Sequence, residues 1–323
     1  MSPPVPRVLC LHGWAQNAEV FERRMAKIVD AFQGDAKFEF FSAPLVLPPR
    51  GDSDRVDARC WFLPSDRWDN FESDQDYLCW WTVTVPALVD FLQQQHEPFD
   101  AILGFSQGGC AAGMLALMAD IGKKSSEADE ITHRAASWVR GVVKEELAKY
   151  FNCTDDRKGT CYSEHESELL VAITEEVRDE AARRALSSLY AESNTSRTGD
   201  ENHASTLFGQ RNLKGLMDYA SQSAIALFQI LWQRPPHFVL IGASPWRGAQ
   251  YTLENENTES GLQLRSLHII GKRDTRVLPT QQEEVARLFA TPEFFYHDGT
   301  HAVPDMRNAE CGAVLRAFLL APE

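Results

Sequence analysis

The sequence predicts an α/β fold, with a mostly parallel sheet of about six strands flanked by helices. Two observations support this class. Short β-rich runs recur along the chain, and each is followed by loop residues and then by a helical pattern, which is the order of strands joined by crossover helices. Apolar residues make up 44% of the chain and charged residues 24%, which is ordinary usage for a protein that buries a core.

The strand candidates are short runs rich in β-branched, aromatic and other apolar residues. They are Arg7–Leu11, Lys37–Ser42, Asp100–Gly104, His237–Ile241, Ser266–Ile270 and Glu293–Tyr296. Between them lie helix candidates, several with apolar residues three and four positions apart. These are Val20–Ala31, Val83–Gln95, Gly109–Ala119, Thr280–Phe289 and Arg307–Leu319.

A long interruption separates the two halves of this pattern. Between residues 120 and 234 no strand is predicted, and apolar stripes such as Leu170, Ile173, Val177 and Ala181 indicate helices. We therefore predict a core of residues 1–119 and 235–323 and an all-helical insertion of residues 120–234. Because the helix before the insertion runs back to the far end of the sheet, the insertion is expected to serve stability or bind a protein partner. A lid that wraps around an edge is the alternative.

Net charge, targeting signals and cysteine spacing predict the partners, the location and the cofactors of the protein. The 323 residues carry a formal net charge of −14, and such an acidic chain repels nucleic acid and anionic membranes. No stretch is long and apolar enough for a signal peptide or a membrane span, which predicts a cytoplasmic location, with the nucleus as the alternative. The seven cysteines contain no Cys-x-x-Cys pair, so we interpret them as free thiols and expect neither a metal site nor a cofactor.

The strongest motif is Gly-Phe-Ser-Gln-Gly at residues 104–108. It directly follows a predicted strand and directly precedes a predicted helix. A nucleophile elbow needs this context, because the sharp strand-to-helix turn exposes the serine hydroxyl and the glycines let neighbouring backbone pass close to it. Ser106 is therefore the candidate nucleophile.

A serine hydroxyl needs a base and a carboxylate that orients the base, in the chain order Ser, Asp, His. His301 is the better base candidate, because the turn after the last strand carries it toward the serine; His297, at the strand end, is the alternative. Asp274 follows the preceding strand by a short turn. Asp298 and Asp305 are the alternatives for the carboxylate.

Two further features indicate how a substrate would be held. Backbone N–H groups of Gln107, after the nucleophile, and Trp14, in the turn Leu11-His12-Gly13-Trp14, are the expected oxyanion donors. The loop from residue 43 to 81 is rich in aromatic side chains, among them Trp61 and Phe62, and Trp246 follows a later strand. We expect these three side chains to bind an apolar acyl or alkyl group.

Together these segments resemble the FSH family of serine hydrolases, the group related to the ovarian-tumour-suppressor-candidate hydrolase, within the α/β-hydrolase superfamily. The matching segments are residues 8–17 (Val-Leu-Cys-Leu-His-Gly-Trp-Ala-Gln-Asn), 104–108, 238–242, 271–279 and 301–304. The resemblance implies an α/β-hydrolase fold, the triad Ser106, Asp274 and His301, and cleavage of carboxyl esters or thioesters without metal or cofactor. It covers about two thirds of the chain and not the helical insertion.

The resemblance leaves two rival interpretations. Where the family commonly has Gly-Gly-His, this chain has Gly299-Thr300-His301, which adds a β-branched residue beside the base. One hypothesis is a serine esterase or thioesterase that acts through an acyl-enzyme on Ser106; an acyl-protein-thioesterase-like enzyme, which shares Gly-Phe-Ser-Gln-Gly, is a variant of it. The other is a protein-interaction module built on a vestigial hydrolase core.

Overall fold

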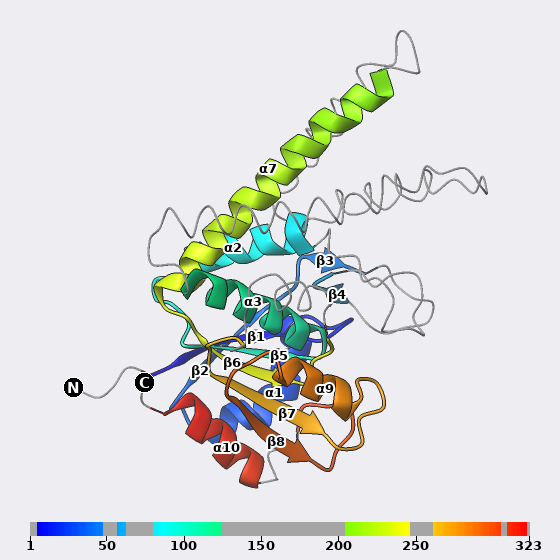
Figure 1. Cartoon of the computed structure of the whole chain (residues 1–323). Coiled ribbons are helices and arrows are strands. Elements are labelled where there is room, and N and C mark those ends of the chain that lie inside the picture. Colours follow the sequence, from blue (N-terminus) through cyan, green and yellow to red (C-terminus); the bar gives the residue numbers. More distant parts are fainter. Residues whose placement is uncertain are drawn as a thin grey trace.

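The computed structural model describes residues 5–47, 57–62, 80–123, 204–245, 261–304 and 309–321. Six of the strands in these residues form one sheet in the order β2-β1-β5-β6-β7-β8, with every neighbouring pair parallel (Figure 1). They are β1 (Arg7–Leu11), β2 (Lys37–Phe41), β5 (Ala101–Phe105), β6 (His237–Ile241), β7 (Ser266–Gly271) and β8 (Pro292–His297). Two short strands, β3 (Leu45–Val46) and β4 (Arg59–Cys60), pair antiparallel in a second sheet. The predicted fold class is confirmed.

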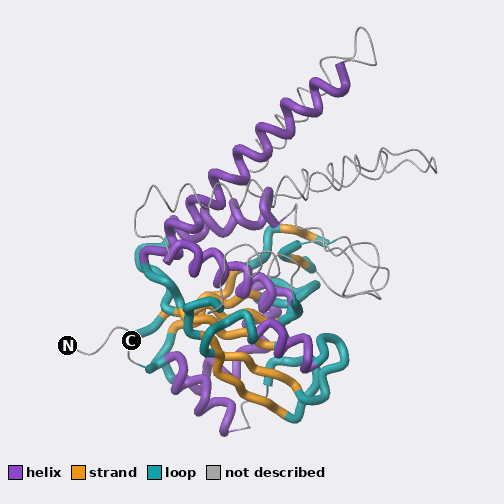
Figure 2. Tube along the Cα trace, in the orientation of Figure 1, coloured by secondary structure: helices purple, strands orange, loops and turns teal. Residues whose placement is uncertain are grey.

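Helices cover both faces of the large sheet (Figure 2). They are α1 (Ala18–Phe32), the π-helical turn η1 (Trp80–Thr84), α2 (Val85–Gln93), α3 (Gln107–Lys123), α7 (Ala204–Gln233), α9 (Pro279–Ala286) and α10 (Ala309–Leu319). One buried apolar cluster joins the sheet to α1 and α10, and another joins it to α2, α3, α7 and α9. The central strands β1, β5, β6 and β7 are mostly apolar and buried, because helices cover both faces of the sheet there.

Helix α1 illustrates how the sequence specifies these elements. Its buried side chains Phe21, Met25, Ile28 and Phe32 recur at intervals of three and four residues, which places them on one face. At its start, the Asn17 side chain accepts a hydrogen bond from the Val20 N–H.

The predicted boundaries differ from the observed ones mainly in the helices. The helix predicted from Val83 consists of η1 followed by α2, and the one predicted to reach Phe289 ends at Ala286. Helix α3 begins two residues earlier and ends four residues later than predicted. Its early start matters, because it places the residue after Ser106 in the first turn of a helix. The six strands of the large sheet lie within one residue of the predicted limits, whereas β3 and β4 were not predicted.

Helix α7 belongs to the predicted insertion, yet its last part packs with the core. Ala220, Ala224, Leu227, Phe228 and Leu231 are all buried in the cluster that contains α2 and α3. Figures 1 and 2 show the rest of α7 extending away from the sheet. The residues before it, 124–203, lie outside the described residues, so most of the insertion stays a prediction.

The strand order creates a switch point between β1 and β5. From β1 the chain proceeds outward to β2, and β5 then lies on the other side of β1. The loops that leave the carboxyl ends of β1 and β5 therefore diverge, and such a crevice is where parallel α/β sheets bind ligands. The Gly-Phe-Ser-Gln-Gly motif lies at this position.

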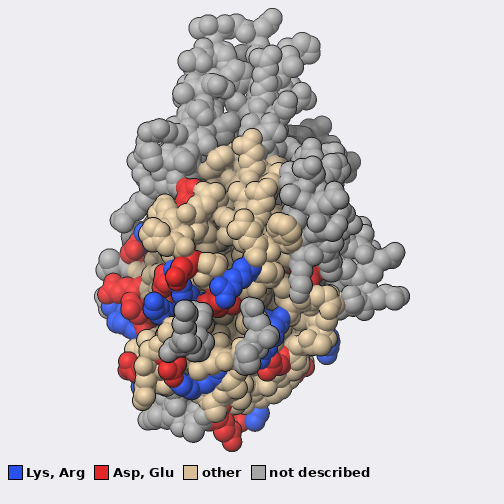
Figure 3. All heavy atoms as spheres, turned by 90° about the vertical axis from the view of Figure 1, so that its left-hand side faces the viewer, with Lys and Arg blue, Asp and Glu red and all other residues tan. Residues whose placement is uncertain are grey.

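The described surface mixes charges of both signs. On the face drawn in Figure 3, acidic and basic side chains are interspersed. Among the described residues, ion pairs such as Arg7–Glu39 and Arg234–Asp100 join opposite charges. In the described ranges, no helix combines the length and apolar character that a membrane crossing requires. The described cysteines, Cys10, Cys60, Cys110 and Cys311, are free and buried.

Candidate active site

Ser106 lies in the sharp turn between β5 and α3. Its φ is 54°, in the left-handed region that residues with a side chain rarely adopt, and its N–H donates to the Ile241 carbonyl of the neighbouring strand end at 2.8 Å. The Ser106 carbonyl in turn accepts from the Cys110 N–H in the first turn of α3. The serine is thus held in strained geometry by backbone contacts on both sides.

The two motif glycines permit this turn because backbone atoms occupy the space of a side chain. A Cβ at Gly104 would lie 2.1 Å from the Gly108 carbonyl oxygen. One at Gly108 would lie 2.1 Å from the Leu11 carbonyl oxygen. Helix α3 therefore starts in direct contact with the end of β1, which brings the loop after β1 to Ser106. A Cβ at Gly13 would lie 3.3 Å from that of Ser106.

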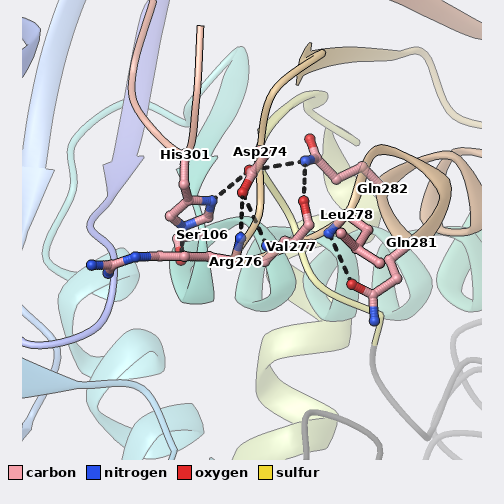
Figure 4. A network of polar contacts seen from close by, with 8 residues as sticks. All are labelled: Ser106, Asp274, Arg276, Val277, Leu278, Gln281, Gln282 and His301. Atoms are coloured by element: carbon pink, nitrogen blue, oxygen red, sulfur yellow. Dashed lines mark hydrogen bonds and ion pairs between the residues drawn. The ribbon is translucent and has the colours of Figure 1, made fainter. Parts of the chain in front are cut away.

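The structure brings together the three residues predicted as a triad (Figure 4). His301 Nε2 lies 2.8 Å from Ser106 Oγ, and His301 Nδ1 lies 2.6 Å from Asp274 Oδ2. A carboxylate accepts hydrogen bonds, so Nδ1 carries the proton and donates to Asp274. Nε2 is then the acceptor for the Ser106 hydroxyl. In this tautomer the imidazole can remove the serine proton.

Asp274 is buried, with 3% of its surface exposed, and it accepts four hydrogen bonds. The Arg276 and Val277 N–H groups donate to Oδ1 at 2.9 and 3.0 Å. Oδ2 accepts from His301 and from Gln282 Nε2, the latter at 3.1 Å. A buried carboxylate requires such partners, and here they also fix its orientation toward the imidazole.

The alternative candidates are His297 for the base, and Asp298 and Asp305 for the orienting carboxylate. His297 is a buried strand-end residue whose Nδ1 accepts from the Gly299 N–H, and burial lowers the pKa of its imidazole. Asp298 is exposed and pairs with Lys272, which lowers the pKa of its carboxyl group. Asp305 lies outside the described residues. Thr300, where the family commonly has glycine, does not keep His301 from reaching both partners.

The two expected oxyanion donors lie on either side of the switch point. Gln107 is the first residue of α3, so its N–H belongs to the helix end whose amides lack intrahelical acceptors. Trp14 follows Gly13 in the loop after β1 and is half-buried. The close approach of Gly13 to Ser106 places this loop beside the nucleophile. Their role as a pair of donors stays a prediction.

The side chain of Gln107 has a second function that the sequence did not indicate. Its Oε1 accepts from the Trp61 N–H at 3.0 Å, and its Nε2 donates to the Phe62 carbonyl at 2.8 Å. The Trp61 indole N–H donates to the His12 carbonyl at 2.7 Å. The motif glutamine thus ties residues 61 and 62 to the start of α3, and the Trp61 indole ties them to the end of β1.

This packing contradicts the substrate-binding role predicted for Trp61 and Phe62. Both side chains are fully buried, at 0% and 2% exposure, in the cluster between the sheet and α2, α3 and α7. The hydrogen bonds to Gln107 hold them inside the core, so their aromatic surface is covered by protein. Trp246, the third predicted substrate contact, lies outside the described residues.

His12, next to the elbow, is a buried residue with backbone partners. Its Nε2 accepts from the Ala43 N–H at 3.0 Å, so Nδ1 carries the proton and donates to the Gly13 carbonyl at 2.8 Å. Burial lowers the pKa of this imidazole to about 4. Its ring therefore supports the loop after β1 as a neutral group. Among the described side chains, no group of three or more is arranged to hold a metal ion.

Comparison with known proteins decides the family. The sequence profile described as Serine hydrolase (FSH1) matches residues 1–151 and 215–311, which is most of the chain. The chain belongs to this serine hydrolase family. The second matched segment begins inside α7, just before the part of that helix that packs with the core.

Curated relatives share shorter segments. The chain is 29% identical over 124 residues to the esterase C25G4.2 of Caenorhabditis elegans, covering 38% of this chain and 55% of that protein. It is 31% identical over 120 residues to the esterase OVCA2 of Xenopus tropicalis, covering 34% and 52%. A protein named dihydrofolate reductase from Schizosaccharomyces pombe is 29% identical over 131 residues, covering 38% and 28%. The matches thus span about half or less of each relative.

Among solved structures, esterase PE8 aligns with a TM-score of 0.46 at 13% identity, covering 98% of this chain and 93% of that one. Acyl-protein thioesterase 2 of Zea mays aligns with a TM-score of 0.46 at 12% identity, covering 97% and 94%. The family assignment rests on the sequence profile.

Proposed function

We propose that this chain cleaves carboxyl esters or thioesters through an acyl-enzyme on Ser106. The observation that carries the proposal is the hydrogen-bonded series Ser106–His301–Asp274, in which the imidazole has an acceptor nitrogen toward the serine and a donor toward the carboxylate. Membership in the serine hydrolase family supports it.

In the first half of the reaction, Ser106 Oγ attacks the carbonyl carbon while its proton passes to His301 Nε2. The carbonyl oxygen becomes an oxyanion, which the N–H groups of Gln107 and Trp14 stabilise. When the carbon–oxygen or carbon–sulfur bond breaks, His301 gives the proton to the leaving alcohol or thiol. Asp274 holds the ring in the tautomer that these transfers need.

In the second half, water attacks the acyl-enzyme. His301 Nε2 accepts a proton from the water and returns it to Ser106 Oγ as the acid leaves. Ser, His, Asp and two backbone amides supply every proton transfer and charge contact of this cycle. The proposed reaction therefore uses no metal or cofactor.

The proposed substrate is a small molecule with an apolar acyl or alkyl group. With Trp61 and Phe62 packed in the core, support for the apolar group rests on the remaining aromatic residues of the segment 63–79 and on Trp246, all outside the described residues. The proposed protein partner would bind the insertion, which the described part of α7 joins to the core.

The test is labelling of the wild-type protein and Ser106→Ala with an active-site fluorophosphonate, alongside turnover of p-nitrophenyl esters. Only an activated serine reacts quickly with the probe. We expect wild type to be labelled and active, and Ser106→Ala to be neither, with an unchanged melting temperature. A wild-type protein that is folded but neither labelled nor active would favour the interaction module.

A further inference from the structure

The two oxygens of the Asp274 carboxylate are held in different ways. Oδ1 accepts from two backbone N–H groups of its own turn, those of Arg276 and Val277. Oδ2, which faces the imidazole, accepts only from side chains among the described residues: His301 and Gln282 (Figure 4). The terminal torsion of an aspartate is broad, so the direction of Oδ2 depends on these partners.

Gln282 lies in α9 and is 2% exposed. Its Nε2 donates to Asp274 Oδ2 at 3.1 Å and to the Val277 carbonyl at 2.7 Å. Both partners are acceptors, so only the amide nitrogen can face them. One side chain therefore connects the helix with the carboxylate and with the turn that carries the carboxylate.

The other end of the same amide is unsatisfied. Gln282 Oε1 is buried and has no hydrogen-bond partner among the described residues. A buried acceptor without a partner lowers stability, and such exceptions in folded proteins call for an explanation. An apolar side chain of similar size would remove this cost but would also leave Asp274 Oδ2 without this donor, so the contact with the carboxylate is what favours glutamine at this position.

We propose that Gln282 is a positioning residue that aims Asp274 Oδ2 at His301. The inference rests on the proposed serine hydrolase function and adds to it a residue that acts through Asp274. By donating to Oδ2, Gln282 keeps that oxygen in the plane and direction in which His301 Nδ1–H can reach it. It also holds the imidazole indirectly in the tautomer that accepts the Ser106 proton.

The first test compares Gln282→Met with Gln281→Met. Gln281 is the adjacent residue, and its Oε1 accepts from the Leu278 N–H at the start of α9, away from the carboxylate. A hydrogen bond to a charged group changes rates by about 10- to 100-fold, so we expect kcat of Gln282→Met to fall by about this factor with little change in KM. Gln281→Met should keep the wild-type kcat.

Stability separates positioning from a structural role. Gln282→Met removes the unsatisfied oxygen but also a donor to a buried carboxylate, so a moderate fall in melting temperature is expected and kcat is compared per folded protein. A wild-type kcat in Gln282→Met, or a loss of activity that follows the loss of folded protein, would overturn the proposal.

The pH profile gives a second readout. Gln282→Met removes a donor that partly offsets the negative charge on Asp274 Oδ2, and the less compensated charge favours the protonated imidazolium, which cannot act as a base. We expect the acidic limb of kcat/KM to move to higher pH. An unmoved limb would show that residue 282 does not act on the base.

A measurement without turnover keeps this inference separate from the proposed function. The His301 Nδ1–H proton should give a downfield proton resonance in wild type. Gln282→Met should shift or broaden it, and Gln281→Met should leave it unchanged. If the wild-type protein is inactive on every ester, the proposed function fails. If the wild type is active but Gln282→Met changes neither the resonance nor kcat, the positioning role fails.

Discussion

The two halves of the candidate site are held by different kinds of contact. The serine half, residues 104–108 with the adjoining residues 11–13, is fixed by backbone: the strained φ of Ser106, its N–H bond to Ile241 and the close approaches at the glycines. The acid–base half, residues 271–282 with 297–301, depends on side-chain hydrogen bonds among Asp274, Gln282 and His301. The serine half is therefore held mainly by backbone contacts, whereas the acid–base half also depends on hydrogen bonds between side chains.

This difference predicts how each half fails. A side chain added at a glycine of the serine half should disturb folding, because the backbone atoms around it cannot move away. A substitution in the acid–base half should reduce catalysis but keep the fold intact, because each side chain there contributes only one or two hydrogen bonds to stability. The following predictions test this contrast.

The largest effect is expected for Gly104→Ala. Its Cβ would lie 2.1 Å from the Gly108 carbonyl oxygen, and relieving that overlap would separate α3 from β5. We expect a loss of unfolding free energy of about 3 kcal/mol or more, measured by urea denaturation. The control is Gly34→Ala, where a positive φ of 89° disfavours alanine but nothing lies within 4 Å of a Cβ. Equal stability of the two variants would contradict the backbone-held serine half.

His301→Ala should remove activity and keep the fold. Triad members act as a unit, so we expect kcat on p-nitrophenyl esters to fall by about 10⁴-fold or more, close to the loss in Ser106→Ala. His297→Ala is the control, because this residue contacts Gly299 rather than Ser106 or Asp274. If His297→Ala were the inactive variant, the base would be misassigned.

Asp274→Asn should cause a large but incomplete loss. The asparagine oxygen can still accept from the Arg276 and Val277 amides, which turns its NH₂ group toward His301 and favours the tautomer with the proton on Nε2. We expect kcat to fall by up to about 10⁴-fold, with residual activity from the oxyanion donors. Asp298→Asn, at an exposed pair with Lys272, should stay near wild type. If Asp298→Asn lost more activity than Asp274→Asn, Asp298 would be the orienting carboxylate.

The same contrast explains what the sequence could predict. The serine half is contiguous, and its glycines and flanking strand and helix are visible in one short window. Asp274 and His301 could be inferred because they follow predicted strands, whose carboxyl ends meet at one edge of the sheet. The strands themselves were predicted closely, since a sheet buried on both faces leaves continuous apolar runs.

The errors concern contacts between distant segments. Gln281 and Gln282 are identical neighbours in the sequence, and only the packing of α9 against the Asp274 turn distinguishes them. The aromatic composition of their loop predicts that Trp61 and Phe62 bind the substrate. Hydrogen bonds between their backbone and the side chain of Gln107, 45 and 46 residues away, hold Trp61 and Phe62 in the core instead.

The pH dependence of stability is expected to depend on His12 in the serine half. Burial lowers the pKa of this imidazole from 6.5 to about 4, and protonation of Nε2 would also set an N–H against the Ala43 N–H. Between these pH values the unfolded chain binds more protons than the folded one. The stabilisation is thus complete above pH 6.5 and is lost as the pH falls toward 4, by about 3 kcal/mol in total.

His268, with a pKa of about 3 through burial, adds an effect of the same sign, so His12 must be isolated by difference. His12→Gln retains a donor and an acceptor for the backbone but does not titrate. Urea denaturation of wild type and His12→Gln at pH 7, 6, 5 and 4.5 should show a less stable variant at pH 7 whose stability declines less steeply on acidification. Parallel stability curves for the two proteins would show that folding does not lower the pKa of His12. They would contradict the inference that a neutral His12 ring holds this loop.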